Sequence, residues 1–487
     1  MKKVKVLLFV AAASLFAACD DAIDIKQPSE FPNPFESVED LQKGLNGVYF
    51  AAPGENHIIF TSIFTDEVKV GIANGGQGLD GELAFQLNNT SDDAASIWLG
   101  NYYLINSANR VIEGAANIVP TEEETAKYNT ILAQAHFLRA YGHFQIITFF
   151  SPNMADDSAL GAILMDYVPA TTDKSPRRTN GEVYAFIESD LAFADANLDE
   201  DLVTEEYVTP FGVSKKAILA FRARMAAYRE KYDLAKSYVD QLGTTLPLAA
   251  KGTATSSPYI NMYSPDNNNA EVIWKLDRAA GGAGNFVGAW SSVNSTVSGS
   301  PFYEVGTSLY SLVSNPLDIR RQAIVDPSAA PGYTVKPVGK YRSSESTNLL
   351  GDIKVFRNSE MYLIRAEYYA SVSDFAGVAS QINAVRRARY GTAAGGAGDI
   401  AAPASQEAAW VAILRERRAE LAFEGHRYVD IRRLGKKANL GIERDVNDFA
   451  FNNAYSLPLD DHRWTLPVPL SEQSANPTIQ QNPGYGN

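Results

Sequence analysis

Cysteine and histidine are scarce in this chain, and both absences limit its chemistry. The 487 residues include one cysteine, Cys19, and five histidines. A single cysteine cannot form an intramolecular disulfide or a zinc site of several thiolates. The chain also has no HExxH pattern, P-loop, dinucleotide fingerprint or GxSxG elbow. Residues 266–269 lack the glycine and distal glutamate of a calcium loop, which favours a turn. We therefore expect no metal and no cofactor.

Positive charge is also in short supply. The chain has 43 lysines and arginines against 57 acidic residues, which gives a formal net charge of −14. So acidic a chain repels a phosphate backbone, and we expect no nucleic-acid partner. The same balance argues against strongly anionic ligands.

Long hydrophobic runs are missing too, since a bilayer span takes about 20 apolar residues. The first residues contain three lysines and then a short apolar stretch that ends in Ala17, Ala18 and Cys19. This order is typical of a secretory signal, and the lone cysteine after small residues predicts acylation of Cys19. Phe16 matches the leucine usual at its position only loosely. We expect a lipoprotein signal peptide at 1–18, a lipidated tether at 19–34 and one domain at 35–487.

Helical periodicity dominates the remaining sequence. Apolar and amide residues between 98 and 112 recur on one helical face. Capping boxes at 121–124 and 179–182 predict the starts of two further helices. The second of the three predicted helices has a stripe of large apolar residues that should be buried. This stripe consists of Ala133, Phe137, Tyr141 and Phe144.

Two later segments repeat one layout of paired helices. Residues 215–230 and 232–242 predict one helix pair, and residues 360–372 and 375–390 predict another. Small residues recur at equivalent places, and Arg222 in the first pair corresponds to Arg365 in the second. Helix pairs of this kind are typical of stacked tetratricopeptide-like hairpins.

Two long segments are rich in glycine, asparagine and serine. They cover residues 74–89 and 279–300, and each also contains large apolar side chains. Loops of this length are usually functional or disordered. Residues 271–276 alternate between polar and apolar side chains and predict a strand.

Acidic residues near the C-terminus raise the question of catalysis. Glu420, Glu424 and Asp430 lie in the arginine-rich segment 415–434. A glycosidase needs a pair of carboxylates, one with a raised pKa. Nearby arginines lower carboxylate pKa values, which favours structural salt bridges over a general acid. Gly425 should end one helix and begin a turn into the next.

The arginine-rich segment resembles the C-terminal signature of the SusD/RagB family, the surface nutrient-binding lipoproteins of Bacteroidota. The likeness recurs along nearly the whole mature chain, in the same order as in the family. The matching segments are residues 98–109, 135–140, 176–191, 270–274, 360–367, 382–386, 415–434, 466–469 and 476–485. One departure is residues 150–153, Phe-Ser-Pro-Asn, where the family more often has a Gly-Asp-Val-Pro-like turn.

The resemblance implies a mostly α, SusD-like fold, in which four tetratricopeptide-like helix pairs pack against a loop-rich irregular half with a few short strands. It implies a lipid-anchored protein at the outer-membrane surface that captures glycans. It also implies a SusC-like TonB-dependent barrel as partner, and no catalysis. Two alternatives remain open, a surface glycosidase or lyase and a helical-repeat adaptor that binds only protein. Turnover by the pure protein distinguishes an enzyme from a glycan-binding protein. Glycan retention in an affinity gel distinguishes a glycan-binding protein from an adaptor.

A glycan site needs aromatic rings for the C–H faces of sugars and polar groups for their hydroxyls. Phe286 and Trp290 lie in an aperiodic loop, where a core role is hard to arrange, so we expect exposed platforms there. Tyr303 follows the same loop and is a third candidate. Trp98 and Asn101 begin the first long helix, where Trp98 is either a platform or, as we favour, a packing residue.

Overall fold

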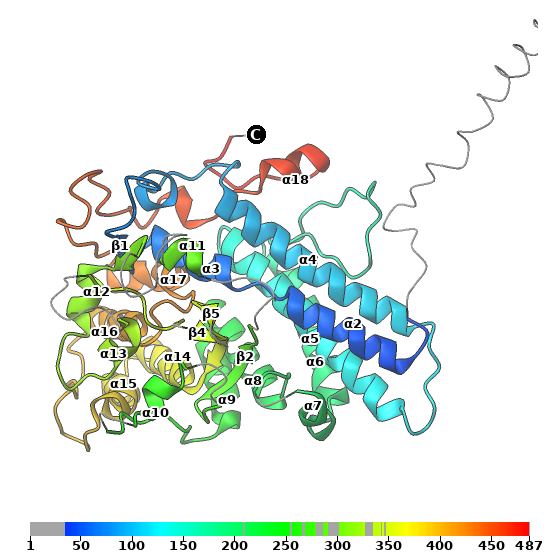
Figure 1. Ribbon diagram of the computed structural model, residues 1–487, viewed down its shortest axis with the longest axis horizontal. Helices are drawn as coiled ribbons and strands as arrows, with labels where there is room; N and C mark the ends of the chain where they lie inside the picture. The colour runs from blue at the N-terminus through cyan, green and yellow to red at the C-terminus, as the bar shows by residue number, and fades with distance from the viewer. Residues whose placement is uncertain are drawn as a thin grey trace, which may run out of the picture.

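The protein is mostly helical, as predicted. The computed structural model describes residues 35–207, 210–253, 256–264, 268–278, 286–290, 301–326, 335–341, 343–344 and 347–486. The predicted signal peptide and tether, including Cys19, lie outside these residues. In Figure 1 the long helices extend to one side, and the other side holds shorter helices, strands and loops.

The helices of the first half are α2 (Val38–Ala51), α3 (Glu55–Phe64), α4 (Asp92–Ala115), α5 (Thr125–Phe150), α6 (Asn180–Asn197), α7 (Glu200–Glu206), α8 (Lys215–Tyr228) and α9 (Tyr232–Leu242), with a 3-10 turn η2 (Gly81–Ala84). Those of the second half are α10 (Pro258–Asn261), α11 (Val287–Trp290), α12 (Thr307–Leu312), α13 (Arg320–Ile324), α14 (Asn358–Ser371), α15 (Phe375–Tyr390), α16 (Gln406–Glu420), α17 (Arg427–Ala438), η3 (His462–Trp464) and α18 (Leu470–Ala475).

Helix α5 is the centre of the first half. Its predicted stripe from Ala133 to Phe144 is buried, and so is nearly all of its last part. The reason is that α2, α4, α6 and α7 all pack against it. Both predicted capping boxes form. Thr179 caps α6 reciprocally with Glu182, and Thr121 pairs with Glu124 just before α5 begins at Thr125.

The predicted helix pairs are α8–α9 and α14–α15, and α9 packs against α14 so that the pairs stack. The pairs α4–α5 and α16–α17 are also packed, in agreement with the four units that the resemblance implies. The two corresponding arginines have corresponding roles. Arg222 of α8 binds Glu188 and Asp195 of the earlier helix α6, and Arg365 of α14 binds Asp240 of the earlier helix α9 at 2.9 Å.

The strands form three antiparallel pairs. They are β1 (Val68–Val70) with β3 (Tyr303–Val305), β2 (Val272–Leu276) with β6 (Ile353–Arg357), and β4 (Ser343–Ser344) with β5 (Thr347–Asn348). The predicted strand at 271–276 is therefore confirmed as β2. Every residue of β2 and β6 is buried, because α8 covers this sheet.

The largest cluster of buried apolar side chains includes residues from Val38 to Ile479, so both ends of the described chain share one core. None of the helices in the described residues is both long and apolar enough to cross a membrane.

Candidate functional site

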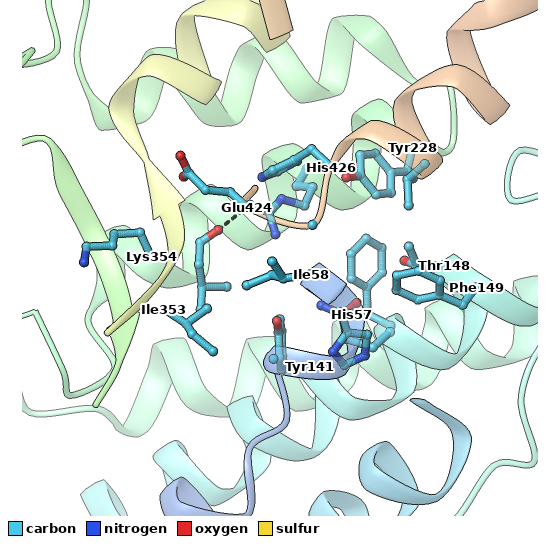
Figure 2. A pocket seen from close by; sticks show the side chains of 17 residues that line it. His57, Ile58, Tyr141, Thr148, Phe149, Tyr228, Ile353, Lys354, Glu424 and His426 are labelled. Atoms are coloured by element: carbon cyan, nitrogen blue, oxygen red, sulfur yellow. Dashed lines mark hydrogen bonds between the residues drawn. The ribbon is translucent and has the colours of Figure 1, made fainter. Parts of the chain in front are cut away.

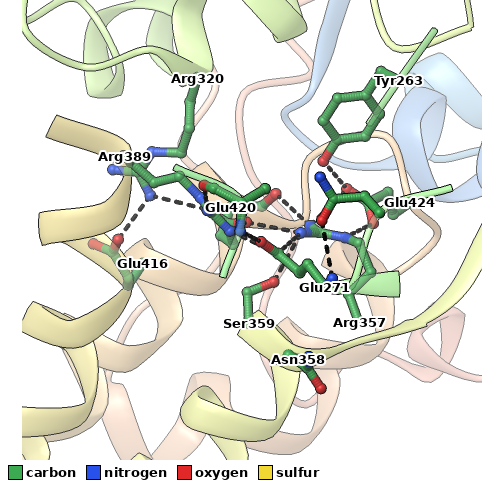
Figure 3. Close-up of polar contacts among 12 residues, drawn as sticks. Tyr263, Glu271, Arg320, Arg357, Asn358, Ser359, Arg389, Glu416, Glu420 and Glu424 are labelled. Atoms are coloured by element: carbon green, nitrogen blue, oxygen red, sulfur yellow. Dashed lines mark hydrogen bonds and ion pairs between the residues drawn. The ribbon is translucent and has the colours of Figure 1, made fainter. Parts of the chain in front are cut away.

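The three acids of the arginine-rich segment are salt-bridged, as predicted. Figure 3 shows Glu420 and Glu424 turned toward Arg357, with Arg389 and Glu271 beside them. Arg357 lies 2.9 Å from Glu420 and 2.8 Å from Glu424. Burial alone would raise the pKa of Glu424, but Arg357 and Lys340 outweigh it and hold that pKa below its usual value. An ionised, buried carboxylate is unsuited to the role of a general acid.

The same segment binds the chain to its distant N-terminal part. Asp66 follows α3 and accepts hydrogen bonds from Arg427 at 2.7 and 2.8 Å. Arg418 lies 3.2 Å from the same carboxylate, and Asp430 pairs with Arg417 at 2.7 Å. Gly425 has a positive φ of 81° and lies in the turn between α16 and α17. Helix α16 ends at Glu420, five residues before Gly425, and Phe423 in the turn also takes a left-handed conformation.

The expectation that Phe286 and Trp290 form an exposed platform is wrong for this structure. Phe286 is 1% exposed and Trp290 is 0% exposed. Tyr341 stacks on Phe286 with 4.2 Å between the ring centroids, and Phe423 packs edge-on against Trp290 at 5.6 Å. Both covering rings come from distant parts of the chain, so the composition of the loop alone could not reveal them.

Tyr303 is also buried, and it joins the two long polar loops. Its hydroxyl donates to the carbonyl oxygen of Gly78 at 3.2 Å. The amides of Gly71 and Ala73 donate to the carbonyls of Phe302 and Pro301, which extends the β1–β3 pairing. Residues 71–78 and 301–303 therefore lie side by side. Residues 279–285 and 291–300 of the second loop lie outside the described residues.

Trp98 and Asn101 both face the interior from α4. Trp98 packs against Tyr102 and Phe150, with 4.9 Å to each ring, which confirms the favoured packing role. Its indole nitrogen donates to Glu472 of α18 at 3.2 Å. Asn101 points toward α3, where its side-chain nitrogen lies 2.9 Å from Nε2 of His57.

Glu472, which accepts this bond from Trp98, lines a pocket of about 210 Å³. We call it the α4–α18 pocket, after the two helices that lie side by side in Figure 1. Its wall is completed by the loop from Ile163 to Ser175. Its polar side chains are those of Tyr102, Asn106, Asn109, Asp173, Ser175, Glu472 and Asn476. One aromatic ring with carboxamides and carboxylates is the chemistry that a sugar ring requires.

Some of these polar groups are already engaged. Asn109 donates to the carbonyls of Met165 and Tyr167, and Tyr102 exchanges hydrogen bonds with the backbone of Ile163. Asn106 differs, because its buried Oδ1 has no hydrogen-bond partner among the described residues. Asn106 therefore offers the pocket a free acceptor, and the ring of Tyr102 lines the same pocket.

A smaller cavity lies deeper in the molecule, between α3, α5 and the turn before α17. Figure 2 shows His57, Tyr141 and His426 among its lining side chains. Its volume is about 50 Å³, which suits a few water molecules and not a sugar. Asn101 donates to Nε2 of His57, so this ring is neutral in the fold. In the described part of the chain, no cluster of three or more acidic, histidine or cysteine side chains is arranged to hold a metal ion.

The fold should lose stability between pH 7 and pH 5 through His57. Burial lowers its pKa to about 4, whereas the unfolded chain titrates at about 6.5. The contribution of His57 to the free energy of unfolding is complete above pH 6.5 and declines as the pH falls toward 4. The reason is that His57 binds a proton in the unfolded state and not in the fold over this range. The loss should reach about 2 kcal/mol at pH 5. Urea unfolding at both pH values should show a smaller decline for His57→Gln than for the parent.

Glu67 and Asp93 act in the opposite direction. Burial raises the pKa of each to about 7, so their protonation in the fold adds stability as the pH falls. Both are present in parent and variant and cancel in the comparison. Equal declines in the two proteins would contradict a neutral, buried His57.

For the α4–α18 pocket, the sequence motifs predicted helix α4 but did not single out Asn106, Glu472 or Asn476 as lining residues. Tyr102 and Asn109 belong to the segment that carries the family resemblance, whereas Asn106 stands between them without any distinguishing pattern. Glu472 lies in the short helix α18 and Asn476 follows its last residue, more than 350 residues along the chain from α4. The one signal for them was the resemblance of the closing stretch, which includes Asn476.

Two family models match the chain. Residues 328–485 match the model described as "SusD family", and residues 20–226 match the one described as "Starch-binding associating with outer membrane". The α4–α18 pocket takes its walls from both matched regions. A curated relative, "SusD-like protein P2" of Formosa agariphila, is 24% identical over 531 residues, which cover all of both chains.

Solved structures share the fold. A SusD superfamily protein from Bacteroides thetaiotaomicron is 21% identical with a TM-score of 0.75, over 92% of this chain and 100% of that one. A putative sugar-binding protein from Bacteroides vulgatus is 20% identical with a TM-score of 0.73, over 93% and 99%. A laminarin-binding SusD-like protein is 21% identical with a TM-score of 0.68, over 92% and 99%. Since models matching both ends of the chain and structures spanning it agree, this protein belongs to the SusD/RagB family.

Proposed function

We propose that this protein binds a glycan at the α4–α18 pocket and passes it, chemically unchanged, to a SusC-like TonB-dependent transporter in the outer membrane. The observation that carries the proposal is the free carboxamide oxygen of Asn106 beside the ring of Tyr102, in a pocket of about 210 Å³. A buried acceptor without a partner is costly, and a sugar hydroxyl would satisfy it.

The comparisons support the class of ligand. One matching family model is described as starch-binding, and two structural neighbours are described as sugar-binding and laminarin-binding. Trp98 acts in this proposal as a positioning residue, because its indole holds the carboxylate of Glu472. Ligand contact by Phe286, Trp290, Tyr303 and Asn101 stays a prediction, and for the two loop rings it requires the covering side chains to move.

The proposal also places the protein at the cell surface, held by acyl chains on Cys19. The description of the family model that matches residues 20–226 names the outer membrane and supports this location. A glycosidase or lyase is the weaker alternative, because Glu420 and Glu424 are buried in ion pairs.

Tyr102→Ala and Asn106→Ala, which both change the lining of the pocket, should each weaken glycan binding by about three- to tenfold. The first removes an aromatic face worth roughly 0.5–1.5 kcal/mol, and the second removes a hydrogen bond of similar value. Retention in affinity gels that contain a panel of glycans, with laminarin first, identifies the ligand. Calorimetry then gives the dissociation constants of the parent and both variants.

Phe50→Ala is the control, because it removes an aromatic ring of α2 that does not line the pocket. It should bind like the parent. Failure of every glycan to retard the parent protein would reject glycan binding. Retention that both pocket variants leave unchanged would move the site elsewhere.

A further inference from the structure

A second and larger cleft lies beside α17. Its volume is about 590 Å³, and none of its lining residues belongs to the α4–α18 pocket. We call it the α17 cleft. Its walls are the loop at 152–155, the end of α8, one face of α17 and residues 459–465. Ligand pockets commonly fall in this size range, and the space suits more than one sugar ring.

Most charges that line the α17 cleft are already paired. Arg433 binds Glu367 at 2.5 Å and Asp430 at 2.9 Å. Lys437 binds Glu230 at 2.9 Å, and Asp461 binds Arg463 at 2.7 Å. Within each pair the opposite charges cancel. The other charged groups of the lining therefore set the sign of the electrostatic potential in the cleft.

Two of the remaining groups are cations on one face of α17. Arg432 and Lys436 are four residues apart, so their side chains lie one helical turn from each other. Within the described ranges neither forms an ion pair, and Lys436 is exposed. Burial lowers the pKa of Arg432, and the neighbouring tyrosines offset that shift only in part. The remaining acid of the lining is Asp460, also exposed.

Arg432 is fixed in position by the end of α5. Its guanidinium donates to the carbonyl of Thr148 at 2.8 Å and to that of Ser151. These carbonyls belong to the last turn of α5, where partners inside the helix are missing. A guanidinium has five N–H groups in a rigid plane. The bonds to α5 therefore leave others for a ligand, and they hold the plane ready at little entropic cost.

The overall charge of −14 does not decide what binds here. Salt screens charges beyond about 8–10 Å, so the two nearby cations outweigh distant acids. The neighbouring Asp460, Asp461 and Glu230 would repel a polyanion or an anionic membrane, yet they accept hydrogen bonds from hydroxyls. Asn153 and Thr465 add neutral polar groups, and the ring of His462 is 40% exposed. A single anion surrounded by hydroxyls fits this arrangement.

We propose that the α17 cleft is a second saccharide site, selective for sugars that carry a carboxylate or sulfate group, with Arg432 and Lys436 as the residues that bind the anion. The inference rests on the proposed function, because it takes a glycan as the ligand. It extends that function to a class of glycan that the net charge of the chain argues against.

The test is calorimetry with an oligosaccharide that contains uronic acid and with its carboxyl-reduced, neutral counterpart. The parent should bind the charged form about five- to tenfold more tightly at low ionic strength, as expected for a charge-assisted contact. The preference should shrink as salt is added. Lys436→Gln should abolish it without changing affinity for the neutral form, and Lys436→Arg should retain it.

Lys43→Gln is the control, because it removes an equally exposed lysine that does not line the cleft. Equal binding of both oligosaccharides by the parent, or a preference that survives Lys436→Gln, would overturn the proposal. Inorganic sulfate that binds as tightly as the charged oligosaccharide would overturn the saccharide assignment. Neutral glycans that bind through Asn106 in the absence of any charge preference would leave the proposed function standing and reject this second site alone.

Discussion

Arg357→Met should destabilise the fold by about 3–5 kcal/mol, the usual cost of breaking a buried ion pair on one side. Arg357 is 1% exposed and lies 2.6 Å from Glu271, 2.9 Å from Glu420 and 2.8 Å from Glu424. Methionine has a side chain of similar length but no charge, so these buried carboxylates lose a neighbouring positive charge. Urea unfolding followed by circular dichroism measures the change in the free energy of unfolding.

Arg415→Met is the matched control on the surface of α16. Arg415 forms a pair of similar length with Glu443, at 2.8 Å, but its side chain is 49% exposed. Its loss should cost less than about 1 kcal/mol. Adding Glu424→Gln to Arg357→Met should recover part of the loss, because the two residues are coupled. A loss below 1 kcal/mol for Arg357→Met would contradict an essential role of the network.

Cys19→Ala should release the protein from the membrane almost completely. Each buried CH₂ of an acyl chain contributes about 0.8 kcal/mol, so two or more chains anchor a protein stably and their removal abolishes that anchor. Separation of membrane and soluble fractions after a high-salt wash measures the effect. Metabolic labelling with a clickable fatty acid should mark the parent and leave the variant unmarked.

A transporter partner would retain some unlipidated protein in the membrane fraction. The fatty-acid label is therefore the measurement that decides whether Cys19 is acylated. A variant that still carries the fatty acid would refute acylation at Cys19. An unlabelled parent would do the same. Ala18→Ser is a suitable control, since it changes a neighbouring small residue and leaves the thiol in place.

The helices were predictable because their signals are local. The predicted helices at 232–242 and 375–390 have the bounds of α9 and α15. In each case a periodic apolar face and a short turn lie within a few residues of one another. The structural salt bridges of the arginine-rich segment were predictable for the same reason. Asp430 pairs with Arg417 and Arg433, which are both close to it in the sequence.

The ligand site was predictable only in part. Trp98 is correctly a packing residue, but its partner Glu472 lies 374 positions away, and no local pattern connects them. Phe286 and Trp290 show the opposite error. Their glycine- and serine-rich surroundings favour exposure, whereas Tyr341 and Phe423 cover them. Long-range contacts decide both cases, and they leave no trace in the spacing of neighbouring residues.

The ion pair between Asp66 and Arg427 has a consequence for how the protein is made. The two residues are 361 positions apart, so most of the chain is synthesised before the carboxylate of Asp66 meets its guanidinium. Until then this carboxylate cannot be buried without a large desolvation cost. The carboxylate of Asp66 therefore stays in water until the residues around Arg427 have been synthesised, so the core closes around it late in folding.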